Sequence, residues 1–312
     1  MADEDSSWDK APEGAHGGRK EVGHVSVLLK EAIDFLAIRR GGTCIDATLG
    51  LGGHSLEIAS RLGPQGHLIG LDKDTQALEL ARKRLFADPA GKPKITLLHS
   101  SFAEIGKLAP PASADGILAD LGVSSLQFGD PGRGFSFQAE GPLDMRMDPQ
   151  GERTADQVVN HMREEDLANV IYEFGEERRS RRIARAIVRA RPIRTTAHLA
   201  NVISAALRSM KNSGRIHPAT RTFQAIRIFV NRELDDLKAL LEAAPQVLKP
   251  GGRLVVISFH SLEDRIVKDA VRDGAKAGIY QVLTKKPVEA TEAEIASNPR
   301  SRSAKLRAAE RI

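Results

Sequence analysis

The decisive stretch of this sequence reads DATLGLGGHS and runs from Asp46 to Ser55. It overlaps a short apolar segment, Thr43–Ala47, that is typical of a buried strand, and it opens an expected helix over Ser55–Leu62. Glycines let a backbone turn tightly and approach a ligand, and the first turn of a helix offers unpaired N–H groups. The stretch therefore predicts a strand–turn–helix unit that binds a ligand, with a purely structural turn as the alternative.

An acidic residue favours the ligand-binding interpretation. Asp72 closes a second expected strand, His67–Leu71, and lies 19 residues after Gly53. A carboxylate there can accept hydrogen bonds from both ribose hydroxyls of an adenosine cofactor. The turn lacks the third glycine of the NAD fingerprint and the Gly-Lys-Ser/Thr of a P-loop. A P-loop nucleotide site is therefore not expected, whereas an NAD-type dehydrogenase stays open as an alternative.

Strands and helices continue to alternate beyond this unit. A helix expected over Thr75–Leu85 is followed by strands expected over Ile95–Leu98 and Gly116–Leu121. This order favours an α/β fold with a parallel sheet covered on both faces. Asp120 stands near a strand end, where such sheets bind ligands. Three roles are open for it: contact with the cofactor, contact with a reacting amine, or capping of the next turn. Phe102 either lies against an adenine or belongs to the core.

A helical segment interrupts the α/β pattern. Residues 127–150 are rich in Gly, Asp, Pro and Met and indicate a long irregular loop, which is usually functional or disordered. Helical patterns follow over Thr154–Met162, Glu164–Phe174, Glu177–Arg191 and Thr196–Leu207, and then one long amphipathic helix is expected over His217–Ala244. The later elements are strands over Leu254–Phe259, Tyr280–Thr284 and Ala304–Ile312 and a helix over Leu262–Val271.

The α/β domain is therefore expected to be discontinuous. Residues 1–20 are polar and without a period, which predicts a disordered tail. We expect the first part of the α/β domain over residues 21–131 and the loop plus a helical insertion domain over residues 132–216. Residues 217–312 are expected to complete the α/β domain.

The composition excludes some kinds of site and indicates the cellular compartment. Cys44 is the only cysteine, which excludes an internal disulfide and a multi-cysteine metal site and fits a reducing cytoplasm. No apolar run is long enough to span a bilayer and no signal-peptide pattern is visible, so we expect a cytoplasmic protein without a membrane partner. His217 and His260 lack metal-ligand spacing, and we expect no metal.

The distribution of charge points toward nucleic acid more clearly than its total. The net charge of +5 comes from 46 basic and 41 acidic residues. Eight arginines, however, lie between Arg178 and Arg194, in a segment expected to be helical. These arginines contact RNA phosphates or, alternatively, form a solvated face beside Glu176 and Glu177. Arg221 is a further candidate for RNA contact.

Six longer motifs resemble one known family. They are GGHS at Gly52–Ser55, DLGVSS at Asp120–Ser125, RGFSF at Arg133–Phe137, GPLDMRMD at Gly141–Asp148, HPATRTFQ at His217–Gln224 and SFHSLEDR at Ser258–Arg265. Ordered matches run from about His24 to the C-terminus, so neither chance nor a shared fold explains them. On these residues the chain resembles the bacterial 16S rRNA cytidine N4-methyltransferase family RsmH, formerly called MraW.

The resemblance implies a Rossmann-like class I methyltransferase sheet with an inserted all-helical domain. It implies S-adenosyl-L-methionine as the cofactor and N4-methylation of one cytidine in the decoding region of 16S rRNA, within the small ribosomal subunit. The cofactor-binding residues that it implies are Gly52, Gly53, His54, Asp72, Phe102, Asp120 and Gln127. His54 starts a helix, so we expect its backbone N–H to matter more than its imidazole. Association into a homodimer is left open.

Catalytic roles are expected of two acids. Acceptors for the amine hydrogens stabilise the positive charge that develops on N4 during methyl transfer, and Asp120, or a carbonyl beside it, is the first candidate. Asp144 is the second, unless it forms a salt bridge with Arg146. Many amino-methyltransferases carry an aromatic residue shortly after the acid that ends the fourth strand, and after Asp120 this aromatic residue is absent. Phe135 or Phe137 is therefore expected to stack on the base, with loop packing as the alternative.

The sequence also leaves other activities open. Methylation of a ring carbon usually needs a cysteine nucleophile, and Cys44 lies within an expected core strand, so a nitrogen or oxygen target is favoured. The alternatives are an NAD-type dehydrogenase, a non-catalytic RNA-binding or assembly module, and a methyltransferase that acts on DNA or on the cell envelope.

Overall fold

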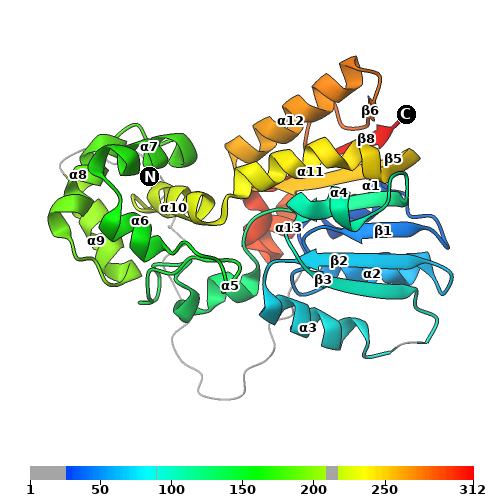
Figure 1. Ribbon diagram of the computed structural model, residues 1–312, viewed down its shortest axis with the longest axis horizontal. Coiled ribbons are helices and arrows are strands. Elements are labelled where there is room, and N and C mark those ends of the chain that lie inside the picture. The colour runs from blue at the N-terminus through cyan, green and yellow to red at the C-terminus, as the bar shows by residue number, and fades with distance from the viewer. Residues whose placement is uncertain (1–25, 89, 209–216) are drawn as a thin grey trace, which may run out of the picture.

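The computed structural model describes residues 26–88, 90–208 and 217–312. Figure 1 shows two parts, a sheet flanked by helices and a smaller group of helices beside it. The tail expected over residues 1–20 lies outside the described residues. In the described part of the chain, no helix is both long and apolar enough to cross a bilayer.

The sheet is built around five parallel strands. In spatial order these are β3 (Lys94–His99), β2 (His67–Asp72), β1 (Thr43–Asp46), β4 (Ala114–Asp120) and β5 (Leu248–Ser258). Next to β5 runs antiparallel β8 (Lys305–Arg311), which also pairs with β6 (Tyr280–Val282) and β7 (Val288–Glu289). The strand order reverses between β1 and β4, which opens a crevice at their carboxyl ends. The expected Rossmann-like α/β sheet is confirmed.

Helices cover both faces of this sheet (Figure 1). One face carries α1 (Leu29–Leu36), α2 (Gly53–Leu62) and α3 (Thr75–Leu85), and the other carries α4 (Ile105–Leu108), α11 (Glu233–Val247) and α12 (Ser261–Lys276). The central strand β4 shows why both layers are needed. Ile117 belongs to one apolar cluster and Leu118 to the other, and both are fully buried, because successive side chains of a strand point to opposite faces.

The second part is all-helical. It comprises α6 (Ala155–His161), α7 (Glu164–Gly175), α8 (Ser180–Ala190), α9 (Thr196–Leu207) and α10 (Thr220–Asn231). Their apolar faces form one buried cluster, distinct from the two clusters at the sheet. In α8, Ile183 and Ile187 are buried in this cluster whereas Arg181, Arg185 and Arg189 are exposed. The helices expected between residues 154 and 207 are confirmed.

The expectation of one long helix over residues 217–244 is wrong. Arg232 separates α10 from α11 and has a left-handed φ of 54°, which a right-handed helix does not accommodate. The apolar periodicity continues across this break, but the two halves have different partners. Phe223 belongs to the helical cluster and Leu237 to a sheet cluster. α10 therefore packs with the inserted helices, while the expected domain boundaries stay a prediction.

Several short elements near the carboxyl ends of the strands were not expected. They are α5 (Ser125–Gly129), α13 (Glu292–Ser297) and the 3-10 turns at Phe102–Glu104, Pro131–Arg133 and Pro299–Ser303. The segment expected as an irregular loop over residues 127–150 begins inside α5 and then follows a course fixed by polar contacts. These short elements matter because they surround the crevice between β1 and β4.

Candidate functional site

A pocket lies at the carboxyl ends of β1, β2 and β4. Most of the residues expected at a cofactor site line it together, namely Gly53, His54, Asp72, Phe102, Asp120 and Gln127. Gly50 and Leu51 from the glycine turn also line the pocket, whereas Gly52 and Asp144 do not. The structure thus brings together residues that are separated by up to 74 positions in the chain.

The glycine turn owes its shape to two left-handed residues. Gly50 has a φ of 51° and Gly52 a φ of 75°, conformations that residues with a Cβ rarely adopt. A Cβ on Gly52 would meet Ala81 at only an ordinary contact distance, 3.5 Å, so conformation rather than space requires glycine there. Gly52 therefore shapes the turn from outside the pocket, and Gly53 begins α2 beside it.

Asp72 ties the second strand to this turn. Its Oδ2 accepts a hydrogen bond from the Gly50 N–H at 2.7 Å, and its Oδ1 accepts one from the Asp74 N–H at 2.8 Å. Burial raises the pKa of Asp72 to about 6, although the two backbone donors favour the charged form. Each carboxylate oxygen can accept a further hydrogen bond, so Asp72 can still bind hydroxyl groups in the pocket.

Asp120 ends β4 with one carboxylate oxygen unsatisfied. Its Oδ2 lies 3.7 Å from Nδ1 of His54, and its Oδ1 is buried without a hydrogen-bond partner among the described residues. Burial raises the pKa of Asp120 to about 6, and the nearby His54 opposes this shift. A buried oxygen without a partner is unfavourable, so this side chain is suited to a ligand that donates a hydrogen bond or carries positive charge.

His54 takes part through its ring as well as through its place at the helix start. Its side chain is 6% exposed, and its Nε2 lies 3.0 Å from the Val27 carbonyl oxygen. A carbonyl oxygen only accepts, so Nε2 is the protonated nitrogen in this contact. The ring therefore links α2 to the segment before α1 and presents Nδ1 toward Asp120.

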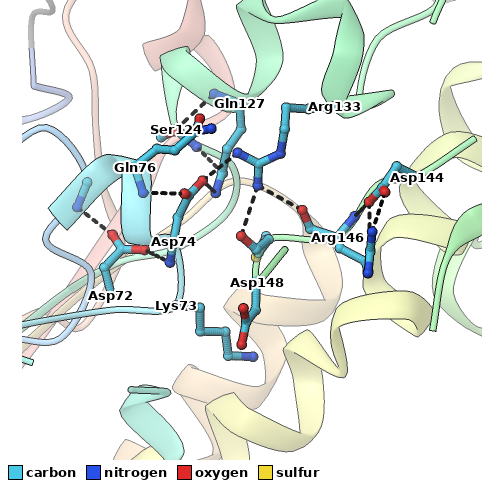
Figure 2. A network of polar contacts seen from close by, with 12 residues as sticks. Asp72, Lys73, Asp74, Gln76, Ser124, Gln127, Arg133, Asp144, Arg146 and Asp148 are labelled. Carbon is cyan, nitrogen blue, oxygen red and sulfur yellow. Dashed lines mark hydrogen bonds and ion pairs between the residues drawn. The ribbon is translucent and has the colours of Figure 1, made fainter. Parts of the chain in front are cut away.

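Gln127 belongs to a buried polar network (Figure 2). Its Nε2 donates to Oδ2 of Asp74 at 2.9 Å, and the Arg133 guanidinium donates to the same oxygen at 2.7 Å. Its Oε1 accepts from the Ser124 N–H in a capping box at the start of α5. Gln127 thus lines the pocket, and its amide links α5 to Asp74, just after the end of β2.

Arg133 extends this network to the loop before α6. Its Nη2 donates to the carbonyl oxygens of Arg146 and Met147, each at 2.9 Å (Figure 2). Asp74, its ion-pair partner, has a fully buried side chain. One arginine therefore fixes the loop that the sequence left irregular and joins it to the sheet.

Asp144 lies in that loop and is engaged elsewhere. Its Oδ1 accepts from Nε of Arg146 at 3.0 Å and its Oδ2 from Nη2 at 2.7 Å, as Figure 2 shows. Burial would raise the pKa of Asp144, but the hydrogen bonds from Arg146 hold it below its usual value. Of the two interpretations weighed for Asp144, the salt bridge is the one present. Its catalytic role stays a prediction without support from the pocket.

Two phenylalanines expected to stack on a base are packed in the protein instead. Phe135 is 6% exposed within the helical cluster. The Phe137 ring contacts the rings of His217 and Phe223, with centroids 4.6 and 4.8 Å apart. Both residues therefore follow the alternative of loop packing, because their rings pack against the core of the inserted helices.

Several pocket residues escaped the sequence analysis. Among them are Glu233, Phe259, Glu263 and Arg300. Phe259 follows β5 and lies beside Gly122, where an added Cβ would be 3.6 Å from the ring. Each comes from a different element, and no local pattern marked any of them as part of a site. The motif SFHSLEDR, which supported the resemblance, was the one signal that could have drawn attention to Phe259 and Glu263.

His260 does lie with two carboxylates, although its spacing in sequence did not indicate a ligand. Potential ligand atoms of Glu233, His260 and Glu263 lie within 4.8 Å of one another. Both Glu233 oxygens, however, accept hydrogen bonds from Arg227 at 2.8 Å. Burial acts to raise the pKa of Glu263. His260 and Arg227 nearby act in the opposite direction and more strongly, so the pKa lies below its usual value. Because Arg227 already compensates the charge of these carboxylates, the three residues fit a buried polar network better than a metal site.

Comparisons with known proteins bear on this pocket. A family model described as the MraW methylase family matches residues 21–312. A protein of Koribacter versatilis (strain Ellin345), described as ribosomal RNA small subunit methyltransferase H, is 70% identical over 312 residues, which covers 98% of this chain and 99% of that protein. A protein of Acidobacterium capsulatum with the same description is 63% identical over 292 residues, covering 92% of this chain and 98% of that protein.

Proposed function

Since the chain belongs to the MraW methylase family, we propose that it methylates the N4 amine of one cytidine in the decoding region of 16S rRNA. Methylation of small-subunit ribosomal RNA with S-adenosyl-L-methionine as the cofactor follows from the family. The nucleotide, the amine and the small ribosomal subunit as the substrate particle are the proposed part. The observation that carries the proposal is Oδ1 of Asp120 at the crevice between β1 and β4, which is buried and has no hydrogen-bond partner in the part of the chain that the structure describes.

The pocket fits this cofactor in chemistry as well as in position. Asp72 offers acceptors for ribose hydroxyls, and Phe102 lies nearby as a surface for the adenine. The glycine turn from Gly50 to Gly53 lets the backbone approach closely. Asp120 and Glu263 add negative charge, which favours a cationic sulfonium. We assign these residues to cofactor binding, with Gly52, His54 and Gln127 supporting their positions.

Asp120 is also the proposed acceptor for the target amine. When bound, S-adenosyl-L-methionine supplies a methyl group activated by the sulfonium, so the protein has mainly to position the nucleophile. The lone pair of the cytosine amine is delocalised into the ring, and an acceptor for its hydrogens favours a pyramidal nitrogen. The unpaired Oδ1 of Asp120 meets this requirement and offsets the positive charge that develops on N4.

Phe259 is the proposed surface for the flipped base. The target cytidine has to leave its stack to reach a pocket at the sheet edge, and a flipped base is commonly held by an aromatic ring. Phe259 lines the pocket beside Gly122, in the loop that follows Asp120. It thereby takes the role that the sequence analysis expected of Phe135 or Phe137.

Replacing Phe259 with leucine is expected to lower kcat/KM for small ribosomal subunits about tenfold, because stacking on an aromatic ring is lost. Phe259→Tyr keeps a ring and should retain most activity. Cofactor affinity, measured by calorimetry, should change little in either variant. Equal activity of the leucine variant and the unchanged protein would contradict the assignment.

The cofactor affinity should depend on pH. The pKa values of Asp72 and Asp120 are both raised to about 6, so both carboxyls ionise between pH 5 and 7. Affinity for the cationic cofactor should therefore rise about tenfold over that interval, measured by calorimetry. The unfolded chain releases these protons at lower pH, so the two groups contribute less to stability as pH rises through 6. A flat affinity profile would contradict ionisation of these groups in the pocket.

A methyl-transfer assay tests the proposed function directly. Small ribosomal subunits lacking the modification are incubated with the protein and radiolabelled S-adenosyl-L-methionine, and the labelled nucleotide is mapped in 16S rRNA. We expect label on N4 of one cytidine in the decoding region. Label on a ring carbon or on no nucleotide would overturn the proposal, and binding of NAD instead of this cofactor in calorimetry would favour a dehydrogenase.

A further inference from the structure

A second cavity adjoins the cofactor pocket on the side of the inserted helices. It measures about 390 Å³, within the range of ligand-binding clefts. Lys73 and Ser100 line both the cavity and the cofactor pocket, so the two lie next to each other at this point. The remaining wall comes from the loop before α6 and from the junction of α10 and α11, where Arg153 and Arg232 lie.

Cations dominate the lining of this cavity. Lys73, Arg146, Arg153 and Arg232 line it with His99, against the two acids Asp148 and Glu152. Three of the four cations are held by carboxylates that do not themselves line it; the pairs are Lys73 with Asp236, Arg146 with Asp144 and Arg232 with Asp235. These basic residues therefore border the cavity, while the acids that pair with three of them lie outside its lining.

Arg153 is positioned differently from the other three cations. Its guanidinium lies 4.6 Å from the centroid of the Phe229 ring, a cation–π contact that supports the group without neutralising it. No acidic partner pairs with Arg153 within residues 26–88, 90–208 and 217–312. Its charge is therefore available to an anion in the cavity.

The walls of the cavity are rigidly built. Asn231, the last residue of α10, accepts a hydrogen bond from the Met147 N–H and donates one to the Met145 carbonyl oxygen, each at 2.7 Å. Arg133 fixes the same loop from the side of the sheet, and Figure 2 shows Lys73 and Asp148 beneath this contact. The backbone of the loop and of the helix junction that carry these residues is thus fixed before a ligand arrives, which reduces the entropy lost on binding.

We propose that this cavity binds a phosphodiester group of the substrate RNA near the target nucleotide, an inference that rests on the proposed function. A base that enters the cofactor pocket brings its own backbone to the same sheet edge. Arginine and lysine are the side chains that bind such phosphates. Asp148, 35% exposed, adds an acceptor for the 2′-hydroxyl that distinguishes RNA from DNA.

The test compares the double variant Arg153→Ala/Arg232→Ala with the control variant Arg272→Ala. Both are assayed by methyl transfer to purified small ribosomal subunits. Arg272 is half exposed on α12, about three helical turns beyond the end that borders the pocket, and pairs with Asp269 and Asp273. The double variant should raise KM for the subunits at least tenfold, with kcat and cofactor affinity within about twofold of the unchanged protein. Its affinity for the subunits should also depend less on salt, with a slope lower by about one per lost contact.

The outcomes separate this inference from the proposed function. If the unchanged protein transfers no methyl group to the subunits, the proposed function fails. If it does, and the double variant matches Arg272→Ala in KM and in salt dependence, the phosphate site is overturned while the function stands. A loss of cofactor affinity without a change in the salt slope would also overturn the site, because it would mean that the two arginines serve only the fold.

Discussion

Replacing Asp120 with asparagine is expected to lower kcat for methyl transfer about 10²–10³-fold, the usual effect of removing one group that stabilises transition-state charge. Asparagine keeps the shape of the side chain and one acceptor oxygen but removes the negative charge. That charge matters because Oδ1 is buried, has no hydrogen-bond partner among the described residues, and would interact more strongly with a nearby positive charge than an exposed oxygen would. The measurement is single-turnover transfer to small ribosomal subunits at saturating cofactor.

Asp144→Asn is the matched control, because it makes the same chemical change outside the pocket. Asp144 is bound to Arg146 on both oxygens, so its replacement should weaken the loop but leave kcat within about twofold. Cofactor affinity of both variants is measured separately by calorimetry. Full turnover by Asp120→Asn with normal cofactor binding would reject the assignment, and a large loss in Asp144→Asn would restore the catalytic role that the sequence analysis gave it.

Arg133→Met is expected to cost about 3–5 kcal/mol of unfolding free energy, the effect of leaving one partner of a buried ion pair without the other. Asp74 has a fully buried side chain, and among the described residues Gln127 and the Gln76 N–H would remain as donors to it. The loop that receives two hydrogen bonds from Arg133 would also be released from the sheet. Urea unfolding followed by circular dichroism measures the change.

Two further variants make this result specific. Arg163 forms an exposed pair with Asp166 one helical turn away, so Arg163→Met should destabilise the protein much less than Arg133→Met. The double variant Arg133→Met/Asp74→Asn should be more stable than Arg133→Met alone, because it removes the unpaired charge. If Arg133→Met were no less stable than Arg163→Met, the Arg133–Asp74 pair would not hold the loop.

The first half of the sheet and the cofactor end of the pocket were predictable from sequence. The turn from Asp46 to Ser55 follows its strand directly, and Asp72 ends the next strand, so both signals are local. Parallel strands bring their carboxyl ends to one edge of a sheet, which is why Asp72 and Asp120 could be placed together before any coordinates were known. The inserted helices were predictable for a similar reason, since each carries its own apolar face.

The target side of the pocket was not predictable in the same way. Phe259 follows a strand and Glu233 starts a helix, and neither position by itself indicates a function. Phe135 had the right chemistry for stacking, but the inserted helices bury it in their own core. The periodicity around Arg232 likewise continued through a break between two helices with different partners.

The glycine turn, the acids at the strand ends and the motifs of the family could be identified without coordinates, because each depends on residues close together in the chain. The packed fold was needed to show which oxygen of Asp120 has no partner among the described residues, which phenylalanine borders the pocket and which cations line the second cavity. The physical reason is that burial and pairing depend on contacts between segments far apart in the chain, and these contacts exist only once the sheet and the inserted helices have packed.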